Sequence, residues 1–73
     1  METKEIIIKA EMEDMGNISS VIQSKKGDFM SIDQEGNFLV VIAKIPSFEL
    51  NSVRICLEEL LGKDKFSMEV YKE

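Results

Sequence analysis

The stretch from Phe29 to Ala43 constrains the fold more than any other part of this 73-residue chain. Within it, Asp33-Gln34-Glu35-Gly36 has Asp at the first position and Gly at the fourth, which are the preferences of a type I turn. A glycine in the left-handed region would close the turn as a bulged hairpin, with Asp33 opposite Asn37. The sequence therefore predicts a β-hairpin whose second strand, residues 38–43, is the most apolar run of the chain.

Apolar periodicity predicts four further elements. Residues 5–12 and residues 65–71 alternate as strands, the first with Ile6 and Ile8 on one face. Residues 17–26 fit a short helix with Asn17 as N-cap, although an extended conformation is the alternative. A second helix follows Pro46 and Ser47, and its apolar positions are Leu50, Val53, Leu57, Leu60 and Leu61, with Gly62 at its end.

The predicted order is β-α-β-β-α-β, an α+β arrangement known as ferredoxin-like, in one domain spanning residues 1–73. Both helices would cover one face of an antiparallel sheet in which the first and third strands are central. Under the predicted turn, the covered face consists of Ile6, Ile8, Met30, Ile32, Phe38, Val40, Ile42, Phe66, Met68 and Val70.

The opposite face of this sheet has no helix to cover it. Because residues 38–43 are apolar on both sides, part of that strand must present apolar surface away from the helices. An apolar patch with a charged rim is typical of an interaction surface. The charged rim would consist of Lys9, Glu11, Lys65 and Glu69. The predicted interface consists of Ile7, Phe29, Leu39, Val41, Ala43 and Tyr71.

The charge and cysteine content exclude several classes of partner and site. Fourteen acidic and nine basic residues give a net charge of −5, which argues against direct binding of nucleic acid or of anionic membranes. One cysteine and no histidine argue against a disulfide framework and against a zinc-type site within one chain. We therefore expect no metal or other cofactor, no membrane association and a cytoplasmic location.

No residue pattern indicates catalysis. Cys56 lies on the apolar stripe of the second predicted helix, where a half-buried, inert thiol is expected. No nucleophile lies beside a recognisable base, so we expect no enzymatic activity. The sequence favours a small interaction module that dimerises or docks onto a larger protein assembly through the uncovered sheet face.

Two resemblances suggest alternatives. Residues 13–18, between the first strand and the first helix, resemble the loop of ACT domains, ferredoxin-like regulatory modules that usually dimerise and bind amino acids at this loop. In that family an Asp stands three residues before the Gly, where this chain has Glu13 before Gly16. The resemblance implies that Glu13, Gly16 and Asn17 bind a small metabolite. The hairpin and the following helix also resemble small subunits of the KEOPS tRNA-modification assembly.

Overall fold

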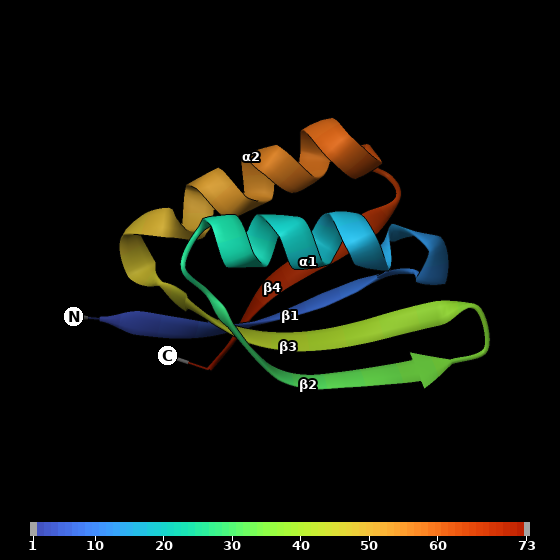
Figure 1. Ribbon diagram of the computed structural model, residues 1–73, viewed down its shortest axis with the longest axis horizontal. Helices are drawn as coiled ribbons and strands as arrows, with labels where there is room; N and C mark the ends of the chain where they lie inside the picture. The colour runs from blue at the N-terminus through green and yellow to red at the C-terminus, as the bar shows by residue number, and fades with distance from the viewer. Residues whose placement is uncertain (1, 73) are drawn as a thin grey trace.

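The protein folds as a four-stranded antiparallel sheet with two helices on one face (Figure 1), and the computed structural model describes residues 2–72. The strands are β1 (Thr3–Glu11), β2 (Asp28–Glu35), β3 (Phe38–Pro46) and β4 (Phe66–Lys72), and the helices are α1 (Met15–Ser24) and α2 (Leu50–Leu61). The sheet order is β2-β3-β1-β4, with β1 and β3 central. The predicted ferredoxin-like arrangement is therefore confirmed.

Both predicted helices form, and each buries a stripe of apolar side chains. A 3₁₀ turn, Met12–Asp14, leads into α1, which therefore begins two residues before Asn17. The three buried residues of α1 are Ile18, Val21 and Ile22. A second 3₁₀ turn, Ser47–Glu49, leads into α2, whose buried residues are Val53, Leu57 and Leu61. Residue 62 caps α2 with a positive φ of 96°, a conformation that glycine adopts without steric cost.

The core lies between the helices and one face of the sheet. Its sheet side consists of Ile6, Ile8, Ala10, Leu39, Val41, Ala43, Ile45 and Met68, all at most 4% exposed. Phe29 and Phe66 are partly buried against this cluster. Ile32 and Val70 lie opposite Val41 and Ile6, on the covered side, but they are 46% and 41% exposed because β2 and β4 are the edge strands.

The predicted turn of the hairpin is wrong, and the error exchanges the two faces of β3. The strands continue to Glu35 and Phe38, which pair directly, so the loop is Gly36-Asn37. Gly36 has φ +61°, and a glycine first in a two-residue loop fits the right-handed twist of the flanking strands. Asp33 consequently lies opposite Val40 and not Asn37. This odd-numbered shift turns every β3 side chain to the other face of the sheet.

Lys44 gives the physical reason for the observed register. With Leu39, Val41, Ala43 and Ile45 facing the helices, β3 buries four apolar side chains, and Lys44 faces solvent. The predicted register would have turned Lys44 toward the helices, and burial of an unpaired ammonium group is costly. Lys44 followed by Ile45 was therefore a signal in the sequence for the correct face.

The two edges of the sheet are each modified in a way that hinders pairing with a further strand. The pairing of β2 with β3 shifts between Phe29 and Ser31, and this bulge leaves Met30 51% exposed. At the other edge, Arg54 of α2 donates from Nη2 to the carbonyl oxygen of Met68, 3.2 Å away, and so occupies a backbone acceptor of β4. Bulges and charged side chains are the usual means of protecting sheet edges.

Candidate docking surface

The structure does not bring the six predicted interface residues together on one surface. Four of them lie on the helix-covered side and belong to the core or pack against it: Phe29, Leu39, Val41 and Ala43. Two irregularities explain these positions. The loop at Gly36-Asn37 turns Leu39, Val41 and Ala43 to the covered face, and the bulge between Phe29 and Ser31 does the same for Phe29. Ile7 lies on the opposite, uncovered face, which we call the open face. Tyr71 is 57% exposed on β4, beside the irregularity in the pairing of β4 with β1.

The open face carries a different set of apolar residues on the two central strands. Ile7 of β1 pairs directly with Ile42 of β3, and Val40 pairs with Lys9 one step closer to the hairpin. Directly paired residues of an antiparallel sheet share a face, with Cβ atoms about 4.5–5.5 Å apart. Phe38 continues the row and is 61% exposed. We call Ile7, Phe38, Val40 and Ile42 the apolar strip.

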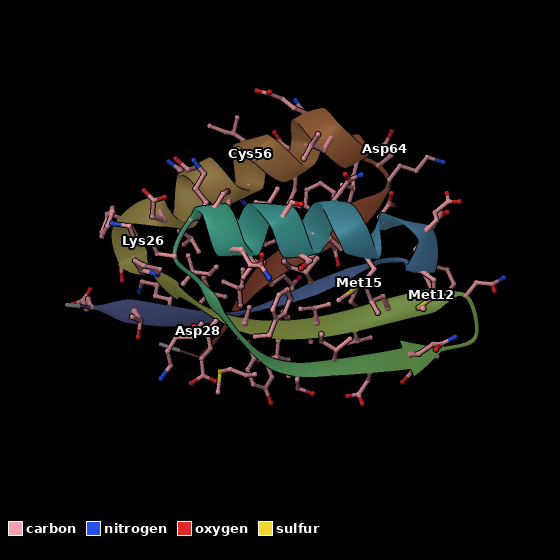
Figure 2. All side chains as sticks on the ribbon, in the orientation of Figure 1. Met12, Met15, Lys26, Asp28, Cys56 and Asp64 are labelled. Atoms are coloured by element: carbon pink, nitrogen blue, oxygen red, sulfur yellow. The ribbon has the colours of Figure 1, made fainter. Side chains whose placement is uncertain are left out.

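Charged residues surround the apolar strip, and most of them are acidic. At the hairpin end, Phe38 is paired with Glu35 of β2 on one side and with Glu11 of β1 on the other. At the far end, Lys44 is flanked in the same way by Asp28 and Glu5. Figure 2 shows Asp28 at the beginning of β2, far from the hairpin loop. The apolar strip is thus bounded by carboxylates at both ends.

A hollow deepens the open face near the hairpin. Its volume is about 610 Å³, and the residues that line it include Ile7, Phe38 and Val40 of the apolar strip. Ligand pockets commonly have volumes of about 300–1,000 Å³, so the hollow has room for several side chains of a partner. Lys9 and Glu35 also line it, and the segment that leads into β4 contributes Asp64 and Lys65. The lining of the hollow therefore combines apolar side chains with charges of both signs.

The residues of the ACT-like loop lie in a helical segment and not in an open loop. Glu13 belongs to the 3₁₀ turn, whereas Gly16 and Asn17 form part of the first turn of α1 and are exposed. Glu13 lines a small hollow of about 280 Å³, and the other lining residues are Glu11, Met12 and Asn37. The structure therefore places Glu13 beside a hollow, whereas Gly16 and Asn17 do not line it.

The outer surface of α2 carries a second group of exposed apolar residues. Phe48, in the 3₁₀ turn before α2, is 66% exposed, and Ile55 of α2 is 53% exposed. Leu60 and the half-buried Cys56 line a groove of about 360 Å³ beside α1. Figure 2 shows Cys56 on α2. These residues are scattered and do not form a strip like that on the sheet.

Two further observations concern the part of the chain that the structure describes. Among residues 2–72, no three side chains of Cys, Asp or Glu form a group that could hold a metal ion. In the same residues, no helix is long and apolar enough to cross a membrane.

Comparison with known proteins identifies the fold and no family. No family model matches the sequence, and no curated protein matches it. The structure is similar to part of the crystal structure of ttk003000868 from Thermus thermophilus, with a TM-score of 0.74 and 26% identity. The match covers 93% of this chain and 10% of that one, so this chain spans about a tenth of the length of its neighbour. In all, 97 solved chains match, and a fold used this widely does not specify a function.

Proposed function

We propose that this protein is a non-enzymatic interaction module that docks onto another protein through its open sheet face. The observation that supports the proposal is the apolar strip, in which Ile7, Val40 and Ile42 lie together on the two central strands. Both helices lie on the other side of the sheet, so neither covers the strip (Figure 1). Apolar residues that are contiguous and rimmed by charge mark protein interaction sites, whereas single exposed apolar residues do not.

The test compares two substitutions of the same type on opposite sides of the molecule. Ile42→Glu introduces a carboxylate in the apolar strip. Ile55→Glu introduces one at an exposed position of α2, on the other side of the sheet. We expect both variants to keep the native far-UV circular dichroism spectrum, because a carboxylate at either position can stay hydrated. A carboxylate that is buried without a partner on association costs several kcal/mol, so only Ile42→Glu should lose binding.

The binding measurement uses a partner that is first isolated with the wild-type protein and then purified for reconstitution. Ile55→Glu should bind it with the wild-type affinity, and Ile42→Glu should bind it at least about a hundredfold more weakly, which corresponds to about 2.7 kcal/mol. Equal affinities for the two variants would exclude the open face as the docking surface. The resemblance to small subunits of the KEOPS assembly makes that assembly one candidate partner.

An ACT-like regulatory domain that binds an amino acid or another small metabolite is the second candidate function. The hollow beside Glu13, next to the junction of β1 and α1, favours it. A ligand that binds the native state raises the unfolding free energy by RT ln(1 + [L]/Kd), so a thermal-shift screen against amino acids and nucleotides tests this reading. Glu13→Ala removes a side chain that lines the hollow and should reduce a thermal shift seen with the wild type. If no ligand shifts the melting temperature of the wild type, this candidate function is excluded.

A further inference from the structure

The described strand residues of the open face carry more carboxylates than ammonium groups. The strand pairings place six carboxylates on this face, and we call them the acidic rim: Glu5, Glu11, Asp28, Asp33, Glu35 and Glu69. The described side chains of the same face include two ammonium groups, from Lys9 and Lys44. Among these described strand residues, carboxylates therefore outnumber ammonium groups by four, and Asp64 and Lys65 beside the hollow add one charge of each sign.

The carboxylates lie close enough to the apolar strip to act on whatever covers it. Asp33 pairs with Val40, Glu69 pairs with Ile7, and Glu11 and Glu35 both pair with Phe38. Neighbouring strands are about 4.8 Å apart, and the screening length at physiological ionic strength is about 8 Å. The field of these carboxylates is therefore only partly screened over the strip.

This charge distribution disfavours a second copy of the chain as the occupant of the open face. A two-fold symmetric dimer places the same patch of both subunits in contact, so each acidic rim would face another acidic rim. Like charges brought together in an interface cost several kcal/mol. Lys44 cannot relieve this repulsion fully, because Asp28 and Glu5 already flank it in its own sheet.

We infer that the partner of the open face is a different protein, whose contact surface carries apolar side chains surrounded by Lys and Arg. This inference rests on the proposed docking function and specifies its partner class. The apolar side chains would fill the hollow over Ile7, Phe38 and Val40, and the cations would pair with Glu11, Asp33 and Glu35 around the hairpin. Complementary charge of this kind raises the association rate and excludes partners of the wrong sign.

The experiment uses two amphipathic helical peptides as probes, with leucines at identical positions and either lysine or glutamate at all others. Amide chemical shifts of the labelled protein report which face each peptide contacts. The lysine peptide should shift amides of β1 and β3, and its affinity should fall about tenfold between 0.05 and 0.5 M NaCl, because salt screens the rim. The glutamate peptide should leave these amides unchanged.

Two triple variants of equal net charge separate a local effect from attraction to an acidic protein in general. The first, which we call the rim variant, removes three carboxylates of the open face: Glu11→Gln/Asp33→Asn/Glu35→Gln. The second, the helix-side variant, removes three carboxylates in and just before α2: Glu49→Gln/Glu58→Gln/Glu59→Gln. Each changes the net charge from −5 to −2. The rim variant should bind the lysine peptide about tenfold more weakly than the helix-side variant does, and loss of the rim repulsion should increase its tendency to dimerise.

Several results would overturn the inference. If both peptides shift the amides of β1 and β3 equally, the open face binds apolar surfaces without regard to charge. If the wild type sediments as a dimer that Ile42→Glu dissociates, a second copy occupies the face. In both cases the docking function stands, and only the partner class is wrong. If neither peptide shifts these amides, or if the two triple variants bind alike, the charged rim does not select the partner.

Discussion

Two neighbouring valines on β3 provide a sharp test of which face of the sheet the helices cover. Val41 is fully buried, whereas Val40 lies in the apolar strip and is partly exposed. Valine and threonine have almost the same shape, so Val41→Thr and Val40→Thr each exchange a methyl group for a hydroxyl and leave the packing volume unchanged. The two variants differ in whether that hydroxyl reaches water.

The expected losses differ by more than the error of a denaturant melt. A hydroxyl buried without a hydrogen-bond partner costs about 1–3 kcal/mol in proteins, so Val41→Thr should lose that much. Val40→Thr should change the unfolding free energy by less than about 0.5 kcal/mol, the usual range for surface substitutions. A stability of about 0.05–0.15 kcal/mol per residue gives this chain about 4–11 kcal/mol, so both variants should remain folded.

Urea unfolding followed by far-UV circular dichroism measures the difference. With a slope of about 1 kcal/mol per molar urea, as in small domains, the midpoint for Val41→Thr should fall by about 1–3 M. The midpoint for Val40→Thr should stay close to that of the wild type. Equal losses, or a larger loss for Val40→Thr, would mean that the register of the hairpin is wrong and that the apolar strip must be redefined.

Two further predictions concern packing in and beside the helices. Leu57→Ala truncates a fully buried side chain in the middle of α2 and should cost about 2–5 kcal/mol in a denaturant melt; a loss below about 0.5 kcal/mol would contradict the packing of that helix. Gly27→Ala would place a Cβ 2.8 Å from Ile45 Cδ1 and 2.9 Å from Ile22 Cγ2, and overpacking of this kind costs about 1–3 kcal/mol. Gly16→Ala meets no atom within 4 Å in α1 and should stabilise by about 0.5–1 kcal/mol, so thermal melts should move the two glycine variants in opposite directions.

The order of the elements could be predicted because each has a local cause. The spacing of Val53, Leu57 and Leu61 specifies a helix, and Gly62 stops it, wherever the segment lies in the fold. The alternation of Ile6 and Ile8 specifies a strand in the same way. The sequence leaves residues 17–26 open between a helix and an extended strand, because the segment is short and its β-branched and serine residues favour helix only weakly. Its packing against the sheet supplies what propensity lacks.

The candidate site could be predicted only in part, because its residues depend on the register of one hairpin. The sequence predicted an apolar patch on the uncovered face of the sheet and placed Ile7 in it, and Ile7 lies there. It placed Leu39 and Val41 in the same patch, whereas the structure places Val40 and Ile42 there. The charge asymmetry of the open face could not be predicted either, because strand pairing is what places Glu11 and Glu35 beside Phe38 and Asp33 beside Val40.

The sequence by itself determined that residues 38–43 form a strand at the centre of an α+β fold, since the segment is apolar and strongly β-forming. It did not determine which side of that strand faces the helices, because the run is apolar on both sides and its period of two fits either choice. The tertiary structure decided between them. Only one of the two orientations keeps Lys44 in solvent and buries Ile45, and that requirement arises from the packing of the helices against the sheet.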